Sequence, residues 1–133
     1  HTDDAIRNAL SALRPLCKGR LFVIFGCGGN RDRTKRPLMA KAAEEGADQI
    51  IVTSDNPRFE QPEDIINDIL AGFASPSRIT VQPDREIAIR ETIARATSND
   101  IILLAGKGHE EYQEINGIKY HFNDTETVKK YLN

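Results

Sequence analysis

The sequence has few cysteines, no excess of basic charge and no long apolar run, and each absence excludes a class of protein. Its two cysteines, Cys17 and Cys27, have no spacing that suggests a disulfide scaffold. We interpret both as reduced thiols of a cytosolic protein, because disulfides are rare in the cytosol. No segment has the character of a signal peptide or a membrane span. Eighteen basic residues against twenty acidic ones give a net charge of -2, so we expect neither nucleic acid nor a membrane surface as a partner.

Two chemical motifs are also missing. No G-x-x-x-x-G-K-[ST] occurs, so nothing in the sequence predicts a cradle for the phosphates of a nucleotide. No cysteine or histidine has a second ligand at metal-site spacing. We therefore expect no catalytic residue and no metal site within this chain.

What is present is typical of one globular domain. The 133 residues, 39% hydrophobic and 29% charged, suit a single domain with one sizeable core. The first residue is His1 and not Met, from which we expect residues 1–133 to be a domain excised from a longer protein.

Short apolar runs alternate with segments of helical spacing. The run "LFVIF" is too short for a helix and reads as a strand that is buried on both faces. Thr2 or Asp3 and, further on, Asp84 are suitable helix N-caps, and Pro37 suits a first helical turn. We expect helices at about residues 2–13, 37–46, 62–73, 84–96 and 125–132, and strands at about 21–25, 49–54, 78–83 and 100–106.

The last part of the chain follows a different pattern. "YQEINGIKYHF" predicts a hairpin with a tight turn at Asn116-Gly117. The predicted fold class is therefore α/β: a Rossmann-like, mostly parallel sheet flanked by helices, with an antiparallel hairpin at its C-terminal edge.

Three loops leave the carboxyl ends of predicted strands, where ligands bind in open α/β sheets. They are "GCGGNRDRTKR" (residues 26–36), "SDNPRFEQ" (residues 54–61) and "GKGHEEYQ" (residues 106–113). We call them the first, second and third rim loops, and we expect them to form one rim that carries the function.

The first rim loop combines glycines with four cations. Gly-x-Gly after a strand lets backbone N–H groups approach an anion, but a tight strand-to-helix turn explains the glycines equally well. Among the cations Arg31, Arg33, Lys35 and Arg36, we expect one to face a ligand carboxylate, although each by itself could be a solvated surface residue.

The second and third rim loops add groups of both signs. Asp55-Asn56-Pro57 is explained by a turn, but Arg58 is not, because its planar fork matches a carboxylate. The alternative is an exposed Arg58 paired with Glu60 or Glu63. In the third rim loop, Glu110 could hold an ammonium group, whereas His109 reads as a structural hydrogen bonder. Cations for carboxylates beside an anion for an amine indicate an amino-acid ligand.

Taken together and in this order, "FGCGGNRDRTKRPLM", "TSDNPR" and "AGKGHEEYQ" resemble the carboxyl-terminal domain of the Mur ligases, in particular those that add 2,6-diaminopimelate. Asn30 and Thr34 stand where that family more commonly has Asp and Gly. The resemblance covers nearly the whole chain. It implies that Arg31, Asn56, Arg58, Gly106 and Glu110 contact meso-diaminopimelate, with Asp55-Asn56-Pro57-Arg58 as the recognition motif.

The resemblance also implies the reaction and the partners. The full-length protein would be a cytoplasmic, ATP-dependent amide-bond ligase of peptidoglycan synthesis, in which the amine of meso-diaminopimelate attacks an acyl phosphate of UDP-MurNAc-dipeptide. An amino-terminal domain would hold the UDP-sugar and a central domain ATP and Mg²⁺, while this domain delivers the amino acid. The alternative is a stand-alone α/β module whose rim binds an anionic metabolite.

Overall fold

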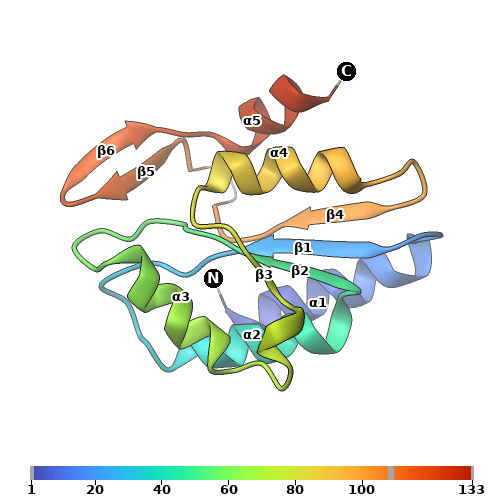
Figure 1. Cartoon of the computed structure of the whole chain (residues 1–133), viewed down its shortest axis with the longest axis horizontal. Helices are drawn as coiled ribbons and strands as arrows, with labels where there is room; N and C mark the ends of the chain where they lie inside the picture. Colours follow the sequence, from blue (N-terminus) through green and yellow to red (C-terminus); the bar gives the residue numbers. More distant parts are fainter. Residues whose placement is uncertain (1, 108–109, 133) are drawn as a thin grey trace.

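A four-stranded parallel sheet lies between two layers of helices in this computed structural model, which describes residues 2–107 and 110–132 (Figure 1). The strand order is β3-β2-β1-β4. β1 (Leu21–Phe25) pairs with β2 (Gln49–Val52) on one side and with β4 (Ile101–Leu104) on the other, and β3 (Thr80–Val81) pairs with β2. The predicted parallel α/β sheet is confirmed.

The helices cover both faces of this sheet. α1 (Asp3–Leu13), α2 (Lys35–Gly46) and α3 (Pro62–Leu70) lie on one face, and α4 (Arg85–Arg95) and α5 (Asp124–Tyr131) on the other (Figure 1). Short 3₁₀ turns occur at Arg14–Leu16 (η1) and Pro76–Arg78 (η2). The side chains of Thr2 and Asp84 cap α1 and α4 as predicted, each accepting a backbone N–H at 3.0 Å. The helix predicted at 62–73 ends at Leu70, three residues early.

The core has two parts because the side chains of a strand alternate between the faces of a sheet. Leu21, Val23 and Phe25 pack against α1, α2 and α3, whereas Phe22 and Ile24 pack under α4. All five residues of β1 are fully buried, which explains why this strand reads as an uninterrupted apolar run.

The C-terminal hairpin is confirmed, with one difference in its placement. β5 (Tyr112–Ile115) and β6 (Ile118–His121) pair antiparallel around Asn116 and Gly117, whose φ angles of 51° and 80° are those of a tight hairpin turn. Within the described residues, however, the hairpin forms a sheet of its own and does not extend the parallel sheet. Its link is a parallel bridge between Ile115 and Arg58 of the second rim loop, so the hairpin supports a loop and not a strand.

Across residues 2–107 and 110–132, the helices are all too short or too polar to traverse a lipid bilayer.

Candidate functional site

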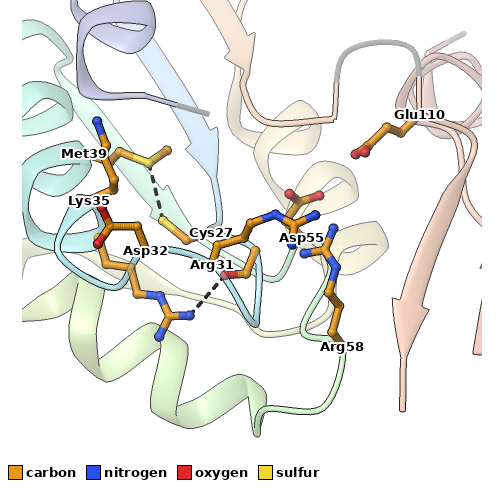
Figure 2. Close-up of a pocket in the computed structure, with 10 residues that line it drawn as sticks. Cys27, Arg31, Asp32, Lys35, Met39, Asp55, Arg58 and Glu110 are labelled. Carbon is orange, nitrogen blue, oxygen red and sulfur yellow. Dashed lines mark hydrogen bonds between the residues drawn. The ribbon is translucent and has the colours of Figure 1, made fainter. Parts of the chain in front are cut away.

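The three rim loops meet at the carboxyl ends of β1, β2 and β4, as the parallel sheet requires. They enclose a cavity of about 370 Å³ (Figure 2). In the view of Figure 2, Arg31 and Arg58 lie between the sulfur atoms of Cys27 and Met39 on one side and the carboxylate of Glu110 on the other. The residues that line the cavity are Cys27, Gly28, Arg31, Asp32, Lys35, Arg36, Met39, Asp55, Arg58 and Glu110.

The predicted site residues therefore divide into two groups. Arg31, Asp55, Arg58 and Glu110 line the cavity itself. Asn56, Pro57 and Gly106 lie in the same loops without lining it, and they shape the backbone around it. Gly106 has a φ of 115°, a conformation in which glycine is strongly favoured. His109 and Gly108 lie outside the described residues, so the prediction for His109 stays a prediction.

The first and second rim loops are joined through their backbones. The N–H of Gly29 donates to the carbonyl oxygen of Asn56 at 2.7 Å. A Cβ on Gly29 would lie 1.8 Å from the carbonyl oxygen of Pro57, so no larger residue fits there without moving one loop. Asn30 extends this junction, because its side-chain oxygen accepts the N–H of Phe59 at 3.1 Å. For Gly29, close approach of backbone to backbone is the reason for the glycine.

The four cations of the first rim loop have different environments. Arg36 is fully buried and donates to both oxygens of Glu60, at 3.1 and 2.8 Å, and to Asp68 at 2.9 Å. Arg33 is exposed and also pairs with Asp68, at 2.9 Å. These hydrogen bonds lower the pKa of both carboxylates: Arg36 does so for Glu60 and chiefly Arg33 for Asp68. Arg33 and Arg36 thus hold the loops together.

The other two cations of this loop, Arg31 and Lys35, also line the cavity. The described hydrogen bond of Arg31 joins its Nη1 to the carbonyl oxygen of the preceding residue, Asn30, at 3.2 Å. Its side chain comes from an exposed residue of the loop. Arg31 thus lines the cavity while its described hydrogen bond goes to a main-chain oxygen and not to a carboxylate.

Arg58 is fixed more firmly than a surface arginine would be. Its backbone N–H donates to the carbonyl oxygen of Glu114 at 2.8 Å, and its own carbonyl accepts the N–H of Asn116 at 2.6 Å. Its Nη1 donates to the carbonyl oxygen of Gly29 at 2.9 Å, and its Nε lies 3.5 Å from the Glu114 carboxylate. The expected alternative partners, Glu60 or Glu63, are wrong, because Glu60 is engaged by Arg36 and the hairpin supplies Glu114 instead.

The backbone of Arg58 is in the left-handed region, with a φ of 54°. Non-glycine residues in this conformation are uncommon and concentrate at functional sites, where the surrounding structure enforces them. Here the hydrogen bonds to β5 on both sides of the residue enforce it. The result is a guanidinium that is held at the edge of the cavity.

Asp55 and Lys107 form a buried ion pair below the cavity. The Lys107 Nζ lies 3.1 Å from an Asp55 carboxylate oxygen, and both side chains are at most 1% exposed. Lys107 also donates to the carbonyl oxygen of Tyr112 at 2.6 Å and to the Asn56 side-chain oxygen at 3.3 Å. Sequence reasoning placed Lys107 in the third rim loop but gave it no role; the structure makes it the point where the second loop, the third loop and the hairpin meet.

The hairpin braces the second rim loop through consecutive residues. The Gln113 side chain donates to the carbonyl oxygen of Asp55 at 2.8 Å, and the Glu114 N–H donates to the Asn56 side-chain oxygen at 2.8 Å. No local sequence signal identifies these residues, because their partners lie 58 positions away.

A second buried pair anchors the other side of the rim. Arg85 at the start of α4 makes a two-pronged contact with Asp124 of α5, at 2.8 and 2.7 Å. The same guanidinium donates to the carbonyl oxygens of Ser54 and Ala105, at 3.2 and 3.3 Å. It therefore joins the ends of β2 and β4, from which the second and third rim loops depart.

The two cysteines are free thiols, with Cys27 buried beside the cavity. Its sulfur lies 3.5 Å from that of Met39. Burial raises the pKa of the Cys27 thiol to about 12. Because the thiolate is the nucleophilic form, Cys27 is unreactive at neutral pH and contributes an apolar wall.

No group of three or more His, Cys, Asp or Glu side chains in the described part of the chain is placed to hold a metal ion. The charged residues that line the cavity come instead from all three rim loops: Arg31, Asp32, Lys35 and Arg36 from the first, Asp55 and Arg58 from the second, and Glu110 from the third. Such an arrangement can bind a small zwitterion with more than one carboxylate.

Comparison with known proteins agrees with this geometry. A family model described as "Mur ligase, glutamate ligase domain" matches residues 1–108. Proteins named UDP-N-acetylmuramoyl-L-alanyl-D-glutamate–2,6-diaminopimelate ligase are 53% identical in Aquifex aeolicus and 57% identical in Haemophilus ducreyi, each over 132 residues. These matches cover 99% of this chain but only 27% and 26% of the relatives.

A solved structure of a protein with the same name superposes with a TM-score of 0.94 at 45% identity. It covers 98% of this chain, which corresponds to 27% of the solved chain. The match includes the helices, the sheet and the region of the hairpin, and the family model covers the first two rim loops in full. This chain belongs to the Mur ligase, glutamate ligase domain family.

Proposed function

We propose that this chain is the amino-acid-binding domain of an ATP-dependent ligase that joins meso-diaminopimelate to UDP-N-acetylmuramoyl-L-alanyl-D-glutamate in the cytoplasm. The observation that carries the proposal is the cavity itself, in which Arg31 and Arg58 lie with Glu110 across one small space. Its volume of about 370 Å³ is within the range of small-molecule sites. The names of the relatives support the same substrates.

The chemistry of meso-diaminopimelate fits this set of side chains. The molecule has an amino and a carboxylate group at each end, whereas lysine lacks the distal carboxylate. Arg58 and Arg31 would each take a carboxylate through charge-assisted hydrogen bonds, and Glu110 would take the distal ammonium. The Asn56 amide, 3.4 Å from a Glu110 oxygen, would complete the group. Arg58 would then be the residue that distinguishes diaminopimelate from lysine.

The residues of this chain do not fit ATP and Mg²⁺ by themselves. The sequence has no P-loop, and the described residues offer no cluster of metal ligands. We assign ATP, Mg²⁺ and the UDP-sugar to other parts of a longer protein, consistent with the 27% of the Aquifex aeolicus relative that this chain spans. The chain alone should neither hydrolyse ATP nor form an amide bond.

The proposal is tested in a chimera in which this chain replaces the 132 matching residues of the Aquifex aeolicus relative. We expect ATP-dependent joining of meso-diaminopimelate, with lysine a much poorer substrate. A folded chimera that does not use diaminopimelate, while the unaltered relative does, would overturn the proposal. Binding of unrelated anions by the chain in that case would favour the stand-alone module.

A second measurement uses the chain as it is. Titration with meso-diaminopimelate should shift the amide resonances of the three rim loops, with lysine as the matched control ligand. We expect weak affinity, because closure of other domains over the ligand normally completes such a site.

A further inference from the structure

Lys107 is buried beneath the candidate site and does not itself line the cavity, although its partner Asp55 does. Its whole residue is 2% exposed, and its ammonium group is neutralised by Asp55 at 3.1 Å. Buried lysines are rare unless they are paired, because removing the charge from water is costly. A neutralised, enclosed ammonium cannot attract a ligand carboxylate directly. The role of Lys107 must therefore lie in the neighbouring groups that it holds in place.

The group that Lys107 holds is the side-chain amide of Asn56. The Asn56 oxygen accepts two hydrogen bonds, from Lys107 Nζ at 3.3 Å and from the backbone N–H of Glu114 at 2.8 Å. An amide oxygen accepts whereas its NH₂ group only donates. Two donors on one side therefore allow one orientation of the amide, with the NH₂ group directed at Glu110, whose oxygen lies 3.4 Å away.

We propose that Lys107 is a positioning residue for amino-acid binding: it fixes the Asn56 amide so that its NH₂ group faces Glu110 at the cavity. Reversal of the amide would place two donors against the Asn56 NH₂ and turn an oxygen toward the Glu110 carboxylate. That arrangement would repel Glu110 from the place where it meets the ligand. The proposal rests on the function proposed above and adds a residue that acts through Asn56.

The third contact of the Lys107 ammonium explains why a lysine suits this place. Its Nζ donates to the Tyr112 carbonyl at 2.6 Å, in addition to Asp55 and Asn56. An ammonium has three N–H donors and no acceptor, and three oxygens surround it here. A neutral hydrophobic residue would leave the Asp55 carboxylate without this partner and the amide without this constraint.

The test removes the Asp55 charge first and then compares variants with and without Lys107 in that background. In the chimera, Asp55→Asn removes the carboxylate but leaves a lysine that can still donate to Asn56. Lys107→Met in this Asp55→Asn background removes the donor without leaving a buried carboxylate unbalanced. We expect the second change to raise KM for meso-diaminopimelate by about tenfold or more, as misplaced binding groups do, with a smaller change in kcat and none in KM for ATP. An unchanged KM for diaminopimelate would overturn the proposal.

A double-mutant cycle then asks whether Lys107 acts through Asn56. In the same Asp55→Asn background, Asn56→Ala should raise KM for diaminopimelate, and adding Lys107→Met should raise it no further. Residues that act as a unit give such non-additive effects, whereas independent residues add. Effects that multiply would show that Lys107 works by another route.

An NMR measurement on the unmodified chain needs no variant. Cross-relaxation from the Asn56 side-chain NH₂ protons should reach the side chain of Glu110. If these protons instead lie against the backbone of Glu114, the amide is reversed and the proposal is wrong. This result is independent of ligation, so it distinguishes a failure of the positioning role from a failure of the proposed function.

Discussion

Gly29 donates its backbone N–H to the carbonyl oxygen of Asn56 at 2.7 Å, and this contact joins the loop after β1 to the loop after β2. Both loops supply cavity residues. Any change in their separation would therefore move Arg31 relative to Arg58. Two neighbouring glycines offer a matched comparison of how tightly this junction is made.

Gly29→Ala should destabilise the chain, and Gly28→Ala should do so much less. The new Cβ at Gly29 would meet backbone, 1.8 Å from the Pro57 oxygen, whereas at Gly28 it would meet the tip of the Arg58 side chain at 2.8 Å. Overpacking against backbone costs about 1–3 kcal/mol, whereas the end of the Arg58 side chain can shift by weakening its hydrogen bond to Gly29. Urea unfolding of both variants measures the loss of stability in each. Equal midpoints would contradict the view that, of the two glycines, Gly29 alone is in tight contact with backbone.

Arg36→Met should lower the free energy of unfolding more than Arg33→Gln. Arg36 is buried and holds Glu60, Asp68 and the carbonyl oxygen of Gly28. Removing one partner of a buried pair costs roughly 3–5 kcal/mol, and we expect the lower end because the two carboxylates are about a quarter exposed. Arg33 is 67% exposed, where ion pairs contribute about 0–1 kcal/mol. Equilibrium denaturation measures the free energy of unfolding of both variants. Similar losses of this free energy would argue against the central role of Arg36.

Glu110→Gln should weaken use of the amino acid in the chimera while leaving the nucleotide unaffected. The change keeps the shape of the side chain and removes its charge. A charge-assisted hydrogen bond contributes roughly 1.5–3 kcal/mol, so kcat/KM for diaminopimelate should fall about tenfold to a hundredfold. Steady-state kinetics should show unchanged KM values for ATP and the UDP-sugar. Loss of nucleotide affinity in this variant would place Glu110 in a different role.

Arg58→Ala should reduce the discrimination between diaminopimelate and lysine. The variant lacks the planar fork that can bind the distal carboxylate, so the kcat/KM ratio of the two substrates should move toward one. Arg58→Lys is the matched control, because it keeps the charge but loses the two-pronged geometry; it should give an intermediate ratio. Paired kinetics with both amino acids provide the measurement. An unchanged ratio in the alanine variant would remove Arg58 from substrate recognition.

Asp100 should make the stability of the chain depend on pH under acidic conditions. Backbone N–H groups of Arg20, at 2.6 Å, and of Thr97, at 2.8 Å, lower its pKa to about 2. A carboxylate with a lowered pKa in the folded state stabilises above its unfolded pKa of about 3.9 and loses this effect as the pH falls toward 2. The stability difference between wild type and Asp100→Asn should therefore be constant above about pH 5 and shrink below pH 4. Denaturation at several pH values measures it, and a difference independent of pH would contradict the role of Asp100.

The layers of the fold could be predicted from the sequence because each depends on a local pattern. The uninterrupted run of β1, the caps Thr2 and Asp84, and the Asn116-Gly117 turn are short-range features, and all three are observed. The position of the hairpin could not be predicted from a local pattern. Its position depends on hydrogen bonds between β5 and the backbone of Arg58, and no local propensity encodes such a contact.

The candidate site was predictable in its position and less so in its internal pairing. Parallel strands bring their carboxyl ends to one edge, so the meeting of the three loops follows from topology. Topology does not predict which cation of the first rim loop is buried. Arg31 and Arg36 have the same side chain, and they differ because Glu60 and Asp68 pair with Arg36, whereas the described hydrogen bond of Arg31 goes to a carbonyl oxygen. In the same way, Lys107 becomes structural through Asp55, a residue 52 positions earlier.

The attachment of the hairpin has an evolutionary consequence. Much of the contact of the hairpin with the second rim loop and with Lys107 is made by main-chain atoms of β5 and the turn. These atoms are the carbonyl of Tyr112, which accepts from Lys107, and the N–H and carbonyl of Glu114 and the N–H of Asn116, which meet Asn56 and Arg58. Every amino acid except proline has the same main-chain N–H and carbonyl groups, so these contacts survive substitution by any other residue. The exposed residues of β6, Ile118–His121, are therefore free to diverge between lineages, whereas an insertion or deletion in β5 would shift the register and displace Arg58. Related sequences should therefore differ in this part of the chain by amino-acid substitutions and not by insertions or deletions.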